Sequence, residues 1–97
     1  MGNALLSIQI IPKTKDGEDV IPYVDQAIAI IEQSGVKYQV HALETTMEGD
    51  LTELFAIVEK MNKAMIDRGS RNVISQIKVL YQPAGASMDA LTEKYRS

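Results

Sequence analysis

The spacing of apolar residues changes repeatedly along the chain, and this change of period constrains the fold more than any other feature. Residues 5–11, 36–42 and 73–81 place apolar side chains at alternate positions, as half-buried β-strands do. A short β-prone stretch covers residues 45–48. Two other stretches, 20–34 and 51–68, repeat apolar side chains at helical spacing. The predicted order is strand, helix, strand, strand, helix, strand.

Residues that commonly begin or end helices and strands mark the limits of these elements. Pro12 is expected to stop the first strand. Asp19 is expected to cap the first helix, and Gly35 to end it. Asp50, with Glu53 three residues later, predicts a capping box at the start of the second helix.

A short amphipathic tail follows the last strand. Ser87 is expected to cap it, and Met88, Leu91 and Tyr95 share one helical face. The chain therefore predicts a single α+β domain over residues 1–97, of the ferredoxin-like βαββαβ type. Its antiparallel sheet would carry two helices on one face, plus a short C-terminal helix.

The sheet of such a fold has one face covered by helices and one open face. Residues expected to meet the helices are Leu6, Ile8, Ile10, Tyr38, Val40, Ile77 and Val79. Residues expected on the open face are Ser7, Gln9, Gln39, His41, Gln76 and Lys78. Because serine, glutamine and histidine both donate and accept hydrogen bonds, we expect this face to become a subunit interface with a ligand pocket. A plain polar outer surface is the alternative interpretation.

The composition excludes several classes of partner. The formal net charge of -3 offers no attraction to nucleic acid or to an anionic membrane surface. The absence of cysteine excludes disulfides and thiolate metal sites, and a reducing cytoplasm is the expected location. No stretch approaches the roughly 20 apolar residues that a membrane helix needs, so no membrane partner is expected.

Catalytic and metal chemistry have little support in the sequence. His41, the only histidine, could act as a base toward Ser7, but no glycine-flanked nucleophile elbow surrounds that serine. Glu44, Glu48 and Asp50 could hold a hard cation, but their spacing matches no calcium loop. Carboxylates at a hairpin end and a helix start are the simpler interpretation. We expect no catalytic residue and no metal.

Several short motifs occur in a fixed order along nearly the whole chain. They are Ile10-Ile11-Pro12 at the end of the first strand, Ser34-Gly35 at the end of the first helix, Thr45-x-x-Glu48-Gly49, and Gln76-Ile77-Lys78-Val79 in the last strand. In these motifs, and across residues 34–50, the chain resembles the thiamine-binding proteins, short ferredoxin-like proteins long catalogued as a domain of unknown function. It departs from the family at Glu44, where a glycine is frequent, and at Leu80-Tyr81-Gln82, where an acidic-basic ending is frequent.

The resemblance implies a non-enzymatic protein that binds thiamine, or its pyrimidine fragment, near the interface of a homodimer or homotetramer, with no other cofactor. A carboxylate beside an aminopyrimidine favours the protonated ring through a charge-assisted hydrogen bond, and Glu48 is the candidate. Thr45 or Thr46 reaches the pocket, depending on the hairpin register. Tyr38 could stack on a ring. The expected ligand-binding residues are Ser7, Gln9, Tyr38, Gln39, His41, Thr45, Thr46 and Glu48.

Two other functions stay open on the sequence. The first is a small enzyme of the dimeric α+β barrel type, in which His41 transfers protons. The second is a structural or regulatory module whose open face binds only a second copy of the chain.

Overall fold

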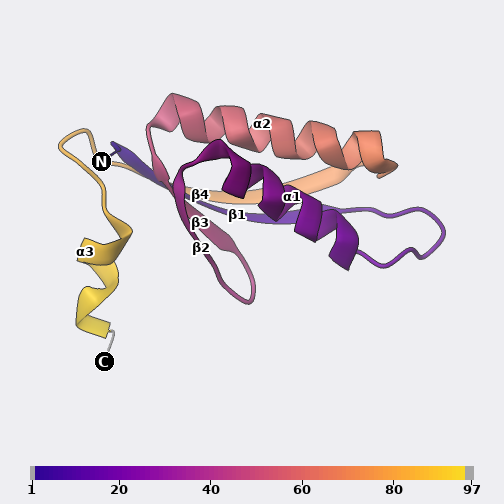
Figure 1. Cartoon of the computed structure of the whole chain (residues 1–97), viewed down its shortest axis with the longest axis horizontal. Helices are drawn as coiled ribbons and strands as arrows, with labels where there is room; N and C mark the ends of the chain where they lie inside the picture. The colour runs from indigo at the N-terminus through magenta and orange to yellow at the C-terminus, as the bar shows by residue number, and fades with distance from the viewer. Residues whose placement is uncertain (1, 96–97) are drawn as a thin grey trace.

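A four-stranded antiparallel sheet with two helices on one side forms the body of the molecule (Figure 1). The structure is a computed structural model that describes residues 2–95. Its elements are β1 (Ala4–Pro12), α1 (Ile21–Ser34), β2 (Lys37–Val40), β3 (Thr45–Gly49), α2 (Leu51–Arg68), β4 (Val73–Tyr81), α3 (Met88–Thr92) and a 3-10 turn (Glu93–Tyr95). The predicted βαββαβ ferredoxin-like order, with a short C-terminal helix, is confirmed.

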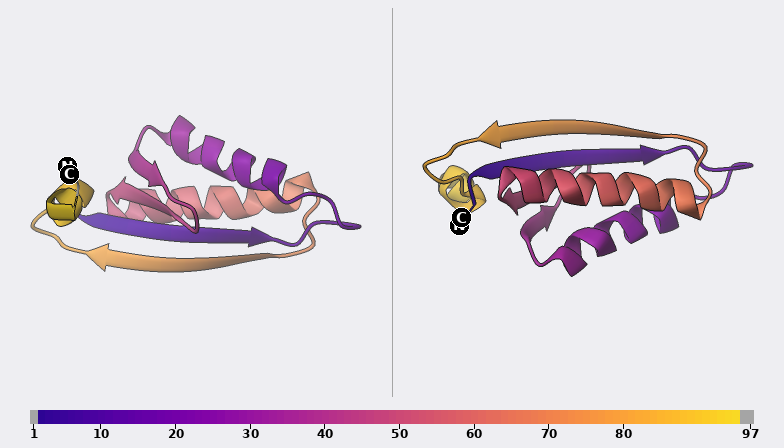
Figure 2. Two further views of the ribbon diagram at one scale, coloured as in Figure 1. Left: turned by 90° about the horizontal axis from the view of Figure 1, so that it is seen from below. Right: turned by 90° about the horizontal axis from the view of Figure 1, so that it is seen from above.

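The sheet has the strand order β2-β3-β1-β4, so β1 lies at its centre and β4 at one edge. All nine residues of β1 pair with β4, from Ala4 opposite Tyr81 to Pro12 opposite Val73. Figure 2 shows these two long strands side by side. On its other side, β1 pairs with β3 from Ala4 to Ile8. Pro12 is thus the last paired residue of β1.

The core lies between the sheet and the two long helices. Directly paired residues share a face, so Leu6 lies with Met47 and Ile8 with Ile77 on the covered side. Each fully buried leucine, isoleucine or methionine contributes about 1.5–3 kcal/mol. The buried cluster consists of Ala4, Leu6, Ile8, Tyr23, Ala27, Ile31, Met47, Leu54, Ile57, Val58, Met61 and Met65. Leu6, Ile8, Ile10, Tyr38 and Ile77 thus lie in or against the core as predicted, whereas Val40 and Val79 are exposed.

The ends of two elements differ from the prediction. The α1 helix has Val20, not Asp19, as its N-cap, although the Asp19 carboxylate accepts a hydrogen bond from the Ile21 N–H at 3.0 Å. Strand β2 ends at Val40, two residues earlier than predicted. The His41 N–H instead donates to the Glu44 carbonyl at 2.9 Å, which closes the loop between β2 and β3. His41 is therefore an exposed loop residue and not part of the sheet.

The start of α2 is also built differently. Asp50 is the N-cap by position, but its side chain makes no capping hydrogen bond, so the predicted capping box is absent. The Asn3 side chain accepts a hydrogen bond from the Leu51 N–H at 2.9 Å instead. Farther along the helix, Leu54, Ile57, Val58, Met61 and Met65 are buried, whereas Phe55 is exposed.

The C-terminal helix α3 covers part of the open face, which the sequence had left bare. Met88 is buried against Leu5 and Ala86, and Leu5 projects from the side of β1 opposite the core. The predicted cap is confirmed, since the Ser87 side chain accepts a hydrogen bond from the Ala90 N–H. Leu91 and Tyr95 are exposed, so Met88 alone of the predicted apolar face is buried.

No helix within residues 2–95 combines the length and the apolar character required to cross a membrane.

Candidate functional site

A chain of polar contacts crosses three strands on the open face. The Thr46 hydroxyl of β3 donates to the Ser7 hydroxyl of β1 at 3.2 Å, and Ser7 in turn donates to the carboxylate of Glu44. From β4, the Lys78 ammonium lies 3.1 Å from the other oxygen of the same carboxylate. The pairing register explains this grouping, because Ser7 lies directly between Thr46 and Lys78.

These contacts keep Glu44 ionised. The hydrogen bond from Ser7, followed by that from Lys78, holds the pKa of the Glu44 carboxyl below its ordinary value. The charges of Lys78 and His41 act in the same direction, and partial burial opposes them. The cluster therefore pairs a partly buried, ionised carboxylate at Glu44 with a largely exposed ammonium at Lys78.

The cluster borders a shallow depression of about 300 Å³. Ser7, Thr46, Glu44 and Lys78 supply its polar groups. The other residues that line it are Leu5, Val79, Leu80 and Leu91, so apolar side chains from β1, β4 and α3 flank the polar groups. Such a surface suits a flat ring with hydrogen-bonding groups along one edge.

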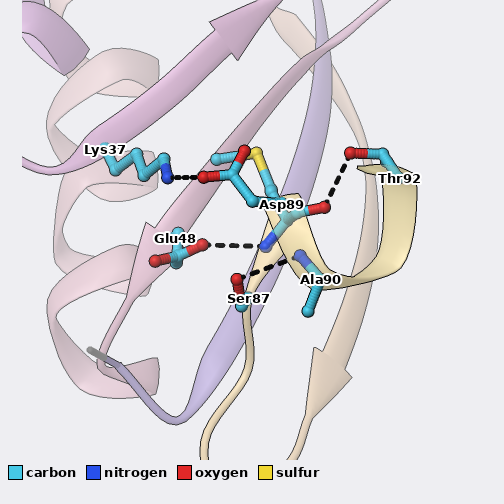
Figure 3. A network of polar contacts seen from close by, with 7 residues as sticks. Lys37, Glu48, Ser87, Asp89, Ala90 and Thr92 are labelled. Atoms are coloured by element: carbon cyan, nitrogen blue, oxygen red, sulfur yellow. Dashed lines mark hydrogen bonds and ion pairs between the residues drawn. The ribbon is translucent and has the colours of Figure 1, made fainter. Parts of the chain in front are cut away.

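Glu48, the carboxylate predicted to meet the ligand, lies on the same face but beneath α3. One of its oxygens accepts a hydrogen bond from the Met88 N–H at 2.8 Å, at the start of that helix (Figure 3). Beside it, Lys37 and Asp89 form an ion pair that also joins β2 to α3. In the structure, Glu48 holds the C-terminal helix on the sheet, and Glu44 is the carboxylate beside the depression.

The remaining predicted site residues divide between the two faces of the sheet. Gln9, paired with Gln76, and Gln39, paired with Thr46, lie on the open face as predicted. Of the two threonines, Thr46 is on the open face, whereas Thr45 is buried on the covered side opposite Ile8.

Tyr38 does not reach the depression either. It pairs with Met47 and packs against the core. The structure therefore keeps Tyr38 and Thr45 apart from the open-face cluster. His41 lies in the loop next to Glu44, but it does not line the depression.

A second cleft, of about 280 Å³, lies between α1 and the β2–β3 hairpin. Thr45, His41 and Glu44 contribute to its lining. Most of the other residues around it are aliphatic, including Ile21, Val24, Ile28, Val40 and Leu43. Glu44 thus borders both hollows, one on each side of the hairpin end.

Two residues of the cluster were not predicted as ligand contacts. Strand alternation had placed Lys78 on the open face, and the pairing of β1 with β4 would have set it beside Ser7. Glu44 follows no strand pattern, because it lies in the loop before β3. Among the described residues, no group of three acidic or histidine side chains is arranged to hold a metal ion.

The fold and the cluster define a small α+β ferredoxin-like protein with a polar depression on the sheet face away from its long helices. Comparison with known proteins places it more narrowly: residues 6–97 match the model of the family described as thiamine-binding protein. The chain belongs to this family.

Relatives and solved structures agree with this placement. A UPF0045 protein of Clostridium perfringens is 40% identical over 96 residues, which are 99% of this chain and 100% of that protein. The structure of a domain of unknown function, DUF77, from Bacillus cereus is 40% identical, with a TM-score of 0.91 over 97% of this chain and 90% of that one. A Thermotoga maritima protein proposed to act in thiamine biosynthesis or salvage is 27% identical, with a TM-score of 0.85 over 96% of this chain and 98% of that one.

Proposed function

We propose that this protein binds thiamine, or a related aminopyrimidine, in the depression on the open face and catalyses no reaction on it. The observation that carries the proposal is the ionised carboxylate of Glu44, held by Ser7 and Lys78 beside an otherwise apolar hollow, in a member of the thiamine-binding family. The predicted cytoplasmic location accords with this role and stays a prediction.

The chemistry of the ligand suits these residues. An aminopyrimidine presents an amine donor next to ring nitrogens, and a carboxylate such as that of Glu44 forms a charge-assisted hydrogen bond with its protonated form. The hydroxyls of Ser7 and Thr46 can donate or accept along the same edge. Leu80 and Leu91 supply apolar contacts for the ring faces.

A second copy of the chain would complete the site. The depression is shallow, and its apolar rim is exposed at Leu80 and Leu91. Ile74 and Tyr81 on the edge strand β4 are also exposed, and no strand of residues 2–95 pairs with the outer edge of β4. An unpaired edge and exposed apolar side chains favour association. The protein is therefore proposed to act as a homodimer or homotetramer.

Two contacts favour a non-catalytic binding protein over an enzyme in which His41 transfers protons. The Ser7 hydroxyl donates a hydrogen bond to the Glu44 carboxylate, so the hydroxyl is not oriented toward a histidine base. His41 lies on an exposed loop, where its backbone N–H closes the turn.

Isothermal titration with thiamine tests the proposal. Saturable binding is expected, and Glu44→Gln should weaken it at least about tenfold, since it removes a charged hydrogen-bond acceptor. The matched carboxylate variants are Glu48→Gln, beneath α3, and Glu32→Gln, exposed on α1. Glu32→Gln should bind with an affinity near that of the native protein. Glu48→Gln keeps an oxygen that can accept the hydrogen bond from the Met88 N–H, so its loss of affinity should be smaller than that of Glu44→Gln. Mass spectrometry of the recovered ligand should return thiamine unchanged.

The alternative results are distinct from one another. No saturable binding by the native protein rejects the function. A larger loss of thiamine affinity in Glu48→Gln than in Glu44→Gln would indicate that Glu48, the carboxylate predicted from the sequence, binds the ligand. A new product in the ligand fraction, lost in His41→Ala, indicates the enzyme instead.

A further inference from the structure

We propose that the depression prefers a ligand that carries a cation and a phosphate in one molecule, with the cation on Glu44 and the phosphate on Lys78. This inference rests on the function proposed above and narrows its ligand: the phosphate monoester of thiamine should bind more tightly than thiamine itself.

The two charged residues of the depression are already paired with each other. The Lys78 ammonium lies 3.1 Å from the Glu44 carboxylate, and among the residues that line the depression they are the only cation and the only anion. Their surroundings differ, because the Lys78 side chain is 78% exposed and that of Glu44 is 31% exposed. Glu44 is also fixed by the Ser7 hydroxyl.

A ligand with only a positive charge meets a competitor at this site. It competes with the Lys78 ammonium for Glu44, and the residues that line the depression offer that ammonium no other anion. Like charges a few ångströms apart repel each other, so part of the gain at Glu44 is lost. The intact ion pair thus disfavours simple cations.

A ligand with both charges replaces one ion pair with two. Breaking the existing pair costs little, because exposed ion pairs contribute about 0–1 kcal/mol. The ammonium sits on a flexible four-carbon stem, so it can move from Glu44 to a phosphate that lies farther along the ligand. A phosphate monoester carries a charge of about -1.5 to -2 at neutral pH and three strong acceptor oxygens.

The number of charged residues in the depression also limits how many phosphate groups the ligand can carry with benefit. The depression offers one lysine, so a second phosphate group finds no further cation among the lining residues. The monophosphate is therefore the form whose charges the depression matches best, with the protonated pyrimidine facing Glu44 and a single phosphate facing Lys78.

Titration of the full chain with thiamine, thiamine monophosphate and inorganic phosphate tests this inference. The native protein should bind the monophosphate at least about fivefold more tightly than thiamine, and added salt should reduce this advantage. Lys78→Met should abolish the advantage and should bind thiamine more tightly than the native protein, because the competing ammonium is gone. Lys60→Met, an exposed lysine on α2, is the matched control and should behave as the native protein does.

The possible failures separate the two proposals. Thiamine monophosphate binding no tighter than thiamine overturns the inference and leaves thiamine binding intact. If Lys78→Met still prefers thiamine monophosphate to thiamine, the inference is also overturned. The same holds if inorganic phosphate displaces thiamine as effectively as thiamine monophosphate does. No saturable binding of either thiamine compound rejects the proposed function and the inference together.

Discussion

At the scale of single residues, Ser7 links the sheet to the charge of the site. It occupies the central strand, accepts a hydrogen bond from Thr46 and donates one to Glu44. Among the causes that lower the pKa of Glu44, this hydrogen bond is the largest. One hydroxyl on β1 therefore fixes a loop carboxylate over the open face.

Replacing Ser7 by alanine should raise the pKa of Glu44 toward its ordinary value. Carbon-detected NMR titration of the side-chain carboxyls measures this shift directly. Ser34→Ala, at the end of α1, removes a hydroxyl that bonds to the Ile31 carbonyl and should leave Glu44 unchanged. An identical Glu44 titration curve in Ser7→Ala and the native protein would contradict the proposed role of the hydroxyl.

The same variant should change the response of stability to acid. The folded-state pKa of Glu44 lies below its unfolded value. Its ionised form therefore stabilises the fold above the unfolded pKa, and this stabilisation is lost as the pH falls through the folded-state pKa. Ser7→Ala narrows the gap between the two pKa values, so its stability should depend less on pH in the acid range.

Strand alternation was sufficient to place Ser7, Gln9, Gln39 and Lys78 on one face, because side chains in a strand point to opposite sides with a period of two. It could not place Glu44. The position of that carboxylate depends on how the loop after β2 closes, and the loop closes through a backbone hydrogen bond that no residue pattern specifies.

At the scale of elements, the start of α2 depends on a residue from another part of the chain. The Asn3 side chain satisfies the Leu51 N–H, whereas the Asp50 side chain caps nothing. Asn3→Ala should therefore lower the free energy of unfolding by about 1 kcal/mol, a typical value for a lost cap. Urea denaturation measures the change.

Asp50→Ala is the control for the cap. It removes a carboxylate near the positive end of α2 but no capping hydrogen bond, so its effect should be smaller than that of Asn3→Ala. A larger effect in Asp50→Ala would show that the local residue, as the sequence first indicated, is the true cap.

The order of the elements could be predicted because apolar spacing differs between strands and helices, and the bounds of α2 and β4 agree with the pattern. The cap of α2 and the position of α3 could not. Both depend on contacts between residues about 40 to 50 positions apart, such as Asn3 with Leu51 and Glu48 with Met88. A local pattern contains no information on such contacts.

At the scale of the whole molecule, the exposed edge strand bears on the oligomeric state. Native mass spectrometry should report a dimer or tetramer. Ile74→Lys places a charge among the exposed apolar side chains of β4 and should reduce the subunit number. Ile66→Lys, at a comparably exposed position on α2, should not. A monomeric native protein, or equal behaviour of the two variants, would contradict assembly through β4.

The long pairing of β1 with β4 has a consequence for how the chain acquires its structure. These are the first and last strands, and they align along nine residues. Until Val73 and the residues after it have been synthesised, β1 lacks β4, the strand with which it forms its longest pairing. Pairing β1 with β4 closes the long loop between Pro12 and Val73, and closing so long a loop slows folding. We therefore expect the sheet to assemble only after β4 has been synthesised, and we expect fragments that lack β4 to remain largely unstructured.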